Sequence, residues 1–350
     1  MKTFNNFYNL IISPESLFIA WKRFSRDKRK KKDVLQFEWN LEQNIFALHR
    51  DLKNKTYKHG SYGSFYITDP KQRHIHKATV RDRVLHHSIV RILTPLFEPI
   101  FIANSFSCRI GKGTHRGVKS VEKMSRIVSQ NYTRDCFGLK CDVRKFFDSV
   151  DHAVLISILR QKIKDEDTMW LLEEIIGSFA SGYSNLFEKK GIPIGNLTSQ
   201  LFANVYMNEF DQFVKHELKV EHYARYTDDF VILSEDKEYL VNLLKPIRDF
   251  LGNTLKLSLH PKKISIRNLH NGIDFLGYVI FPHHRLLRTK TKNRVAKGMM
   301  RRLKDQESGG IEPDQVVQSL HSYIGVLAHA NTHRFTEKLK NDFWFWLSEK

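Results

Sequence analysis

The chain has 350 residues, of which 41% are hydrophobic and 12% aromatic, which is enough to bury a large core in two or three subdomains. Its 57 Lys and Arg residues against 38 Asp and Glu residues give a formal charge of +19 and predict a polyanionic partner. The three cysteines lack CxxC spacing, so we expect neither structural zinc nor a disulfide framework, and a reducing cytoplasm fits. No apolar run approaches the roughly 18 residues of a membrane span, so no membrane partner is expected.

Residues 1–65 are predicted to form a basic, mostly helical extension with turn signals at Gly60 and Gly63. Residues 22–32 contain eight basic residues and one acidic residue. Such a run forms either a solvated surface or a phosphate-binding one, because phosphate supplies the missing countercharge. Three nearby aromatic residues are predicted to anchor this extension to the core rather than to stack on bases: Trp21, Phe24 and Phe37.

A short strand is predicted from Phe137 to Val143, where apolar and polar residues alternate. Asp142 therefore projects from the face opposite the core, near the end of the strand. The spacing of apolar residues then becomes helical from Val154 to Ile163, with Asp148 to Asp151 as candidate helix caps. A second helix is predicted from about Ser199, and its apolar stripe is Leu201, Phe202, Val205, Tyr206, Phe210 and Phe213.

Two adjacent carboxylates, Asp228 and Asp229, follow Tyr226 in a short turn between two strand-like segments. Paired negative charges repel each other unless a cation lies between them. A bare Asp-Asp pair is usually a solvated hairpin tip, but Asp142 supplies a third carboxylate from another strand. If these strands are neighbours, the carboxylates could gather around two metal ions and promote phosphoryl transfer. That is the chemistry of a nucleic-acid polymerase.

The C-terminal region is strongly basic, since residues 285–304 contain nine basic residues and no acidic one. A row of cations of this kind suits RNA or a hybrid duplex. We expect helices here, broken at Gly309-Gly310 and closed by the aromatic residues Phe343 to Trp346, which are predicted to pack in the core. The pairs His86-His87 and His283-His284 are predicted to lie on the surface or contact nucleic acid.

Seven segments, taken in chain order, resemble the motifs of reverse transcriptases. They are Arg73–Arg83, Ser105–Gly117, Asp142 with Phe146-Phe147, Gly191–Gln200, Tyr226–Asp229, Lys263 and Phe275–Tyr278. The resemblance implies an α+β, right-hand polymerase fold, with fingers, a palm built on an antiparallel sheet and a helical thumb. It implies the activity of an RNA-directed DNA polymerase. The implied limits are 1–65 for the basic extension, 66–140 for the fingers and start of the palm, 141–152 for the catalytic palm strand, 153–187 for fingers helices, 188–284 for the palm and 285–350 for the thumb.

The resemblance also implies roles for individual residues. Asp142, Asp228 and Asp229 are the expected catalytic residues. Two Mg²⁺ ions, for which Mn²⁺ can substitute, would be held by Asp142, Asp228 and the carbonyl of Val143, with Asp229 a ligand or a close neighbour of one. Phe147 matches a steric gate against ribonucleotides, although it could also be an ordinary core residue. The expected nucleotide-binding residues are Arg73, Lys77, Phe147, Ile194, Gly195, Asn196 and Gln200, with Lys71 a weaker candidate for the phosphates. The expected primer and template contacts are Tyr226, Lys263, Gly277, Tyr278, Arg288, Lys290 and Arg294.

The segment Ile194-Gly195-Asn196, followed by Ser199-Gln200, departs from the Gln-Gly and Ser-Pro found in most bacterial reverse transcriptases. It resembles the reverse transcriptases of diversity-generating retroelements, which copy a template-repeat RNA with errors at adenines. This implies as partners a template RNA, its RNA/cDNA hybrid, deoxynucleoside triphosphates and a small basic helical accessory protein oligomer, in a bacterial or archaeal cytoplasm. The alternatives are an antiviral-defence reverse transcriptase with a dedicated RNA, and a non-catalytic RNA-binding scaffold. A retron enzyme and a group II intron maturase fit the sequence less well.

Overall fold

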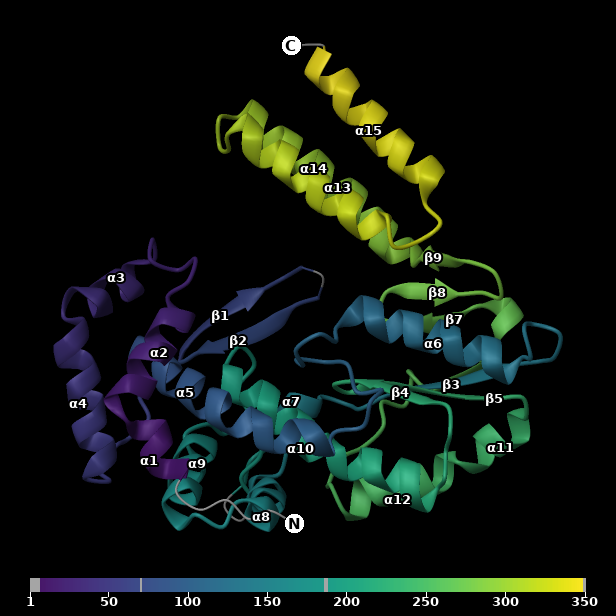
Figure 1. The fold of residues 1–350 in the computed structure, drawn as a ribbon. Helices are drawn as coiled ribbons and strands as arrows, with labels where there is room; N and C mark the ends of the chain where they lie inside the picture. The colour runs from purple at the N-terminus through teal and green to yellow at the C-terminus, as the bar shows by residue number, and fades with distance from the viewer. Residues whose placement is uncertain (1–6, 70, 186–187, 349–350) are drawn as a thin grey trace. The chain divides into compact units, whose positions relative to one another are not determined.

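The computed structural model describes residues 7–69, 71–185 and 188–348 and shows a mixed helix and sheet fold (Figure 1). The first six residues of the expected extension, and residues 186–187 of the expected fingers helices, lie outside the described residues. The chain divides into two compact units that interleave along the sequence. Unit 1 comprises Met1–Cys108, Asp142–Val220 and Leu244–Pro261, and unit 2 comprises Arg109–Cys141, Glu221–Leu243 and Lys262–Lys350. The domain limits expected from the resemblance stay a prediction.

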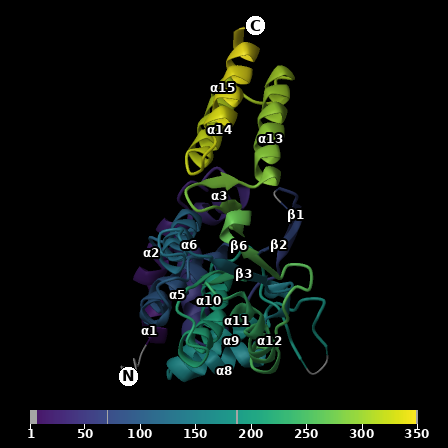
Figure 2. The ribbon, with the colours of Figure 1, turned by 90° about the vertical axis from the view of Figure 1, so that its right-hand side faces the viewer.

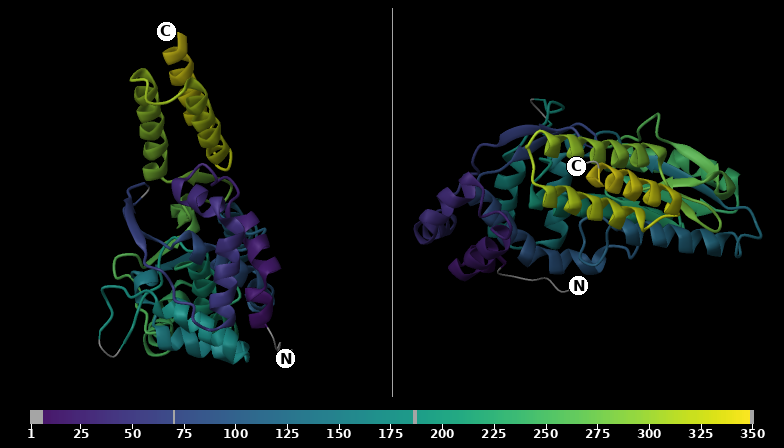
Figure 3. Two further views of the ribbon diagram at one scale, coloured as in Figure 1. Left: turned by 90° about the vertical axis from the view of Figure 1, so that its left-hand side faces the viewer. Right: turned by 90° about the horizontal axis from the view of Figure 1, so that it is seen from above.

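Unit 1 is mostly helical. Its helices are α1 (Phe7–Ile12), α2 (Pro14–Phe24), α3 (Lys32–Trp39), α4 (Leu41–Lys53), α5 (Val80–Phe97), α7 (Phe146–Ser149), α8 (His152–Lys162), α9 (Glu166–Gly177), α10 (Leu197–Gln212) and α12 (Leu244–Asn253). Strands β1 (Gly63–Ile67) and β2 (Arg73–Lys77) form an antiparallel hairpin. Helices α1 to α4, purple in Figure 3, pack against α5. Gly63 is therefore the first residue of a strand, and its prediction as a turn residue was wrong.

The basic extension is anchored by aromatic residues, as predicted. Trp21 and Phe24 are 3% and 1% exposed, and the rings of Trp21 and Phe37 lie with their centroids 5.3 Å apart. The start of α2 explains the local fold, because Ser13 accepts a hydrogen bond from the main-chain N–H of Ser16 and a proline occupies the first helical turn. Burial of these two large rings stabilises the packing of α2 against α5.

Helix α10 lies among the other helices of unit 1 and packs on α5 and α8. It begins at Leu197, two residues before the expected start, and most of its predicted stripe is buried. Phe213 is the exception, since it lies beyond the end of α10 in a π-helical turn and is half-buried. Tyr206 lies within the helix and donates a hydrogen bond to the carbonyl of Leu255 at 2.6 Å. This helix is nearly all buried, which suits a central support.

Unit 2 contains two sheets and the C-terminal helices. Its strands are β3 (Phe137–Asp142, whose last residue belongs to unit 1), β4 (Tyr223–Tyr226), β5 (Asp229–Ser234), β6 (Ser265–Asn268), β7 (Ile273–Phe275), β8 (Tyr278–Ile280) and β9 (Arg285–Leu287). Its helices are α6 (Thr114–Val128), α11 (Lys237–Asn242), α13 (Thr289–Glu307), α14 (Pro313–Leu327) and α15 (His333–Ser348). One sheet has the order β4-β5-β3-β6 and the other β7-β8-β9, with α6 packed on β4, β5 and β8 (Figure 1). Figure 2 shows the C-terminal helices α13, α14 and α15, coloured green to yellow. Antiparallel pairing is seen within both sheets.

Strand β3 confirms the alternation expected from the sequence. Leu139 and Cys141 are fully buried, whereas Lys140 and Asp142 are half-buried on the other face. The switch to helical spacing is also confirmed, because α8 starts at His152 and Asp151 accepts a hydrogen bond from the N–H of Val154 at 3.0 Å. The period of the apolar residues was thus sufficient to place this strand and helix.

Two predictions about aromatic and histidine side chains were wrong. Phe343 is buried, but Trp344 and Phe345 are exposed, and the side chain of Trp346 lies outside the described residues. Helix α15 thus buries only part of the expected cluster. His86 is buried rather than at the surface.

None of the helices in the described part of the chain combines the length and the apolar character that spanning a membrane requires.

Buried His86 makes folding sensitive to acid. Neither ring nitrogen has a hydrogen-bond partner among the described residues, and burial, with the neighbouring His59, lowers the pKa of His86 to about 3. The unfolded chain takes up this proton near pH 6.5, so stability is lost as the pH falls from about 6.5 towards 3. Because of His86, the unfolding free energy should be about 2 kcal/mol lower at pH 5 than at pH 7.5. We expect His86→Leu to abolish this part of the pH dependence. Urea unfolding at both pH values tests this, with exposed His270→Leu as the control. An unchanged pH dependence would contradict it.

Candidate active site

The acidic turn joins β4 and β5 in unit 2. Tyr226 pairs with Asp229, so Thr227 and Asp228 alone form the turn of a two-residue hairpin. Thr227 adopts a left-handed conformation with φ 55°, which is unfavourable for a β-branched residue. The guanidinium of Arg225, which is fully buried, donates a hydrogen bond to the carbonyl of Thr227 at 3.0 Å. Arg225 therefore holds the turn that presents Asp228, a role that was not predicted from the sequence.

A lysine from the neighbouring strand faces Asp229. Strand β5 lies next to β3, and the ammonium of Lys140 lies 3.5 Å from a carboxylate oxygen of Asp229. Both side chains are at most 20% exposed. Because Lys140 and Asp142 are two residues apart on one strand, they share a face of the sheet. The paired carboxylates are thus partly neutralised by a cation, which reduces the repulsion expected in the turn.

The carbonyl of Val143, the residue after Asp142, points away from the segment that pairs with this part of the chain. The carbonyl of Asp142 accepts a hydrogen bond from the N–H of His260, and the N–H of Arg144 donates to Ser258, each at 2.8 Å. Successive carbonyls of an extended chain point to opposite sides, so the carbonyl of Val143 points away from Ser258 and His260. This orientation is consistent with the expected role of Val143 as a main-chain metal ligand.

These donors suit magnesium. Carboxylate and carbonyl oxygens are its preferred ligands, and it is usually held by one or two carboxylates together with substrate phosphates rather than by a cage of side chains. Within the described ranges, no three or more His, Cys, Asp or Glu side chains form a group that could hold a metal ion. The assignment of Asp142, Asp228, Asp229 and Val143 to the metal stays a prediction that the donor chemistry supports.

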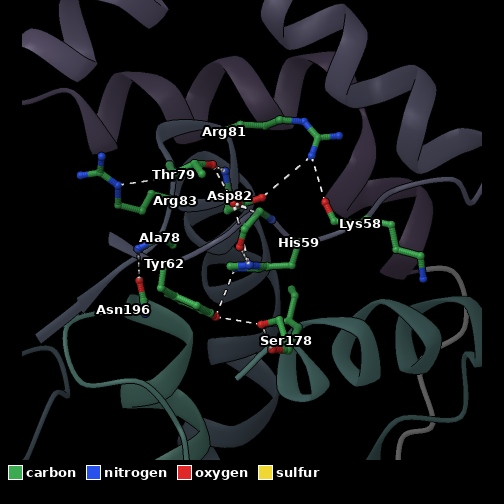
Figure 4. Close-up of polar contacts among 12 residues, drawn as sticks. Lys58, His59, Tyr62, Ala78, Thr79, Arg81, Asp82, Arg83, Ser178 and Asn196 are labelled. Carbon is green, nitrogen blue, oxygen red and sulfur yellow. Dashed lines mark hydrogen bonds and ion pairs between the residues drawn. The ribbon is translucent and has the colours of Figure 1, made fainter. Parts of the chain in front are cut away.

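The segment Ile194–Asn196 is joined to the β1–β2 hairpin within unit 1. The N–H of His76 donates to the carbonyl of Ile194, and the amide of Asn196 donates to the carbonyl of His76, both at 3.0 Å. The amide oxygen of Asn196 accepts from the N–H of Ala78 at 3.4 Å (Figure 4). Asn196 is 1% exposed, so its amide positions the hairpin, which differs from the direct nucleotide contact expected from the sequence.

Gly195 allows this close approach. Its φ of 111° lies in the region that favours glycine, and a Cβ here would come 2.8 Å from the Cγ2 atom of Ile75. Ile194 is half-buried beside it, whereas Gln200 is exposed on the first turn of α10. The expected nucleotide-binding segment therefore presents Ile194 and Gly195 from a position fixed by β2.

A buried carboxylate that was not predicted from the sequence supports the base of the hairpin. Asp82 is fully buried and accepts hydrogen bonds from the hydroxyls of Tyr57 and Thr79, at 2.7 and 2.6 Å. It also accepts from the N–H of Gly60, at 3.1 Å, and His59 lies 3.9 Å away (Figure 4). Thr79 in turn caps α5. The Thr-x-x-Asp spacing is the signal that could have identified this capping arrangement.

The expected phosphate-binding cations differ in their surroundings. Arg73 and Lys71 are exposed, at and just before the start of β2. Lys77, however, forms an ion pair with Asp33 at 2.7 Å, and Arg83 contacts the same carboxylate at 2.6 Å. Lys77 is therefore engaged with α3, so Arg73 is the better candidate for the phosphates.

The expected primer and template residues fall into two groups. Lys263, Lys290 and Arg294 are exposed, and Tyr226 is half-buried. Gly277 has φ 89° and forms the turn between β7 and β8, as a tight turn requires. Tyr278 is 3% exposed, with its hydroxyl 3.4 Å from His115, so its ring supports the packing beside the turn rather than making the expected contact. Arg288 is paired with Asp274, but 34% of its side chain is exposed, and its contact with nucleic acid stays a prediction.

Comparisons with known proteins agree with this arrangement. Residues 58–280 match the family model described as reverse transcriptase (RNA-dependent DNA polymerase). Protein YkfC of Escherichia coli (strain K12) is 26% identical over 300 residues, which cover 75% of each chain. The group II intron-encoded protein LtrA of Lactococcus lactis subsp. cremoris is 23% identical over 371 residues, covering 86% of this chain and 60% of LtrA. The chain thus spans less than two thirds of LtrA.

Two more distant similarities are also found. Nuclear intron maturase 1, mitochondrial, of Arabidopsis thaliana is 22% identical, covering 70% of this chain and 46% of that one. A solved structure of apo telomerase from Candida Tropicalis, truncated from the C-terminal domain, aligns with a TM-score of 0.48 and 11% identity, covering 70% of this chain and 60% of that one. The family match extends over more than half of the sequence and includes all the expected catalytic aspartates. The chain therefore belongs to the reverse transcriptase (RNA-dependent DNA polymerase) family.

Proposed function

We propose that this reverse transcriptase copies a template-repeat RNA into cDNA with errors at adenines, for a diversity-generating retroelement. The observation that carries the polymerase chemistry is the sheet order, in which the hairpin holding Asp228 adjoins the strand that ends at Asp142. Such carboxylates, borne by neighbouring strands, suit two-metal phosphoryl transfer. The relatives include proteins named for group II introns, so the finer assignment to a retroelement rests on the segment Ile194–Asn196 together with Ser199-Gln200.

Each residue at the proposed site would have a distinct task. Asp142, Asp228 and the carbonyl of Val143 would hold divalent metal, which when bound supplies a Lewis acid for the primer 3′-hydroxyl and for the departing pyrophosphate. Lys140 offsets the negative charge of Asp229, which reduces the repulsion between the two adjacent carboxylates of the turn. Arg73 would bind the triphosphate, because its planar guanidinium matches paired phosphate oxygens.

The retroelement assignment is supported by Ile194, whose side chain has no hydrogen-bonding group. Its main chain is held to His76, so its side chain occupies a defined place next to Gly195. A glutamine here could donate and accept hydrogen bonds to an incoming nucleotide, whereas isoleucine offers only apolar contact. Without such a polar interaction, the discrimination between right and wrong bases falls, typically by about 1–3 kcal/mol. Template RNA and a basic helical accessory oligomer, in a bacterial or archaeal cytoplasm, are the partners and setting that this proposal implies.

We expect Ile194→Gln to lower misincorporation opposite adenine by roughly tenfold, with a smaller change opposite the other bases. Sequencing of cDNA made on a defined RNA template measures this directly. The matched control is Ile194→Leu, which keeps the volume and the apolar character and should keep the error pattern. Unchanged accuracy at adenines in Ile194→Gln would refute the role given to this position. Uniformly low errors in the unmodified protein would instead favour a defence-associated enzyme with its own RNA.

A further inference from the structure

Unit 2 contains an open groove away from the acidic turn. Two adjoining hollows of about 490 and 730 Å³ share Tyr132, His283 and His284 in their lining. One wall is helix α6, and the other is the turn that joins β8 to β9, with the segment before α15 at one end. Helix α6 packs on β8, so both walls belong to one packed region (Figure 1).

The groove is strongly cationic. Lys119, Lys123 and Arg126 are exposed along the wall that α6 provides, three and four residues apart, which places them on one face of the helix. The one carboxylate in the lining, Glu122, is paired with Arg285 at 2.6 Å. The acidic residue is thus compensated within the wall itself, and the three cations of α6 face the groove without an acidic counterpart in its lining. Such a surface attracts a polyanion.

The groove also contains aromatic faces. The ring of Tyr132 meets His283 with centroids 4.8 Å apart and a 73° angle between the planes. Phe281 and His284 stack at 4.9 Å and 7°. His283 and His284 are exposed, as the sequence predicted. Flat rings beside a row of cations match the faces of nucleobases and the phosphates between them.

The backbone that presents Tyr132 is strained. Gln130, Asn131 and Tyr132 all have φ between 46° and 70°, a left-handed conformation that is costly for three successive residues other than glycine. The loop is fixed by the guanidinium of Arg126, which donates to the side-chain oxygen of Asn131 at 2.7 Å, and by the hydroxyl of Ser129, which accepts from the N–H of Tyr132 at 3.0 Å. Backbone strain of this kind persists only where surrounding contacts hold the residues in place. These hydrogen bonds therefore fix the loop, and the loop holds Tyr132 at the groove.

We propose that this groove binds a single-stranded segment of nucleic acid, with bases stacked on Tyr132 and His284 and phosphates on Lys119 and Lys123. Open walls and separated rings suit unpaired bases, which a duplex would keep stacked inside itself. This site is distinct from the polymerase centre, and its occupancy does not require the reaction proposed above. The unpaired strand can be RNA or cDNA, since both provide the same stacking and charge.

The test uses the full chain without deoxynucleotides, so that it is independent of polymerisation. Fluorescence anisotropy compares a 12-nucleotide single-stranded RNA, the DNA of the same sequence and their blunt hybrid. Tyr132→Ala should weaken single-strand binding about tenfold, whereas Tyr132→Phe should retain it. Lys119→Gln with Lys123→Gln should lower the salt dependence of that binding by roughly 0.7 for each phosphate that is no longer neutralised. Hybrid binding should change less than twofold, about the limit of such a measurement.

The matched control removes the same two charges elsewhere, with Lys237→Gln and Lys245→Gln, which are exposed and lie outside the groove. A loss for RNA alone assigns the groove to template, a loss for DNA alone assigns it to product, and an equal loss assigns it to either strand. The proposal is overturned if neither single strand is affected, or if hybrid binding falls as much as single-strand binding. The lysine variants keep the test valid should the Tyr132 loop fail to fold after substitution. Normal primer extension by the same variants would separate this result from any failure of the polymerase assignment.

Discussion

Asp228→Asn is expected to lower deoxynucleotide incorporation by at least roughly 10³-fold while leaving RNA affinity within about twofold. The substitution keeps the size of the side chain and removes the charge that would hold a divalent metal, which is worth several kcal/mol in the transition state. Arg225 still holds the carbonyl of Thr227, so the hairpin itself should persist. Primer extension on an RNA template and anisotropy with labelled RNA, measured on one preparation, test both halves of the expectation.

Asp249→Asn is the matched control for this change. Asp249 is exposed on α12, so the same loss of charge there should leave incorporation unchanged. Retained or higher thermal stability without activity in Asp228→Asn would be the expected signature, because removing one of two adjacent carboxylates relieves repulsion in the turn. Persistent synthesis at a normal rate in Asp228→Asn would overturn the metal assignment, whereas RNA binding without any synthesis by the unmodified protein would favour the alternative of a non-catalytic scaffold.

The elements around this turn could be predicted because their signals are local. The period of two from Phe137 to Val143 placed the strand and the face of Asp142, and a change to helical spacing placed α8. Tyr226 and Asp229 flank a turn too short to fold in many ways. In each case the information lies within about ten neighbouring residues, and tertiary contacts reinforce it.

Partners that lie far along the chain could not be predicted in the same way. Lys77 pairs with Asp33 and Asn196 bonds to the main chain of His76, contacts that span 44 and 120 residues and depend on how separate helices pack. Lys140 was placed on the polar face of its strand, but its pairing with Asp229 required the strand order. Local patterns give the direction of a side chain, whereas the identity of its partner is a property of the packed unit.

The exposed fraction of a side chain is equally hard to predict from sequence. His86 lies in a helical stretch with another histidine beside it, which resembles a polar surface, yet it is buried among the helices of unit 1. Tyr278 was expected to contact primer because it ends the Phe275–Tyr278 motif, but its ring packs inside unit 2 near His115. Motif matches locate a segment reliably, and they leave open which of its side chains face the solvent.

Phe147→Ala is expected to reduce discrimination against ribonucleotides by about 5- to 150-fold, the equivalent of roughly 1–3 kcal/mol of relieved steric clash. Phe147 is half-buried in α7, a helix that begins directly after Lys145, whose backbone adopts a left-handed conformation. The carbonyl of Phe147 accepts a hydrogen bond from the main-chain N–H of Ile192 at 2.8 Å. The backbone of this expected gate is therefore tied to the segment expected to bind the nucleotide, so truncating the ring should open space without moving the chain.

The measurement is the ratio of kcat/KM for deoxyribonucleotide to that for ribonucleotide, which is independent of the fraction of folded enzyme. Phe147→Leu, which keeps more of the bulk, should give an intermediate ratio, and exposed Phe46→Ala should leave the ratio unchanged. If Phe147 were instead an ordinary core residue, truncation would lower stability by about 3–5 kcal/mol and leave the ratio as it was. The two roles thus separate in one pair of measurements, because a gate changes selectivity and a core ring changes only the amount of folded protein.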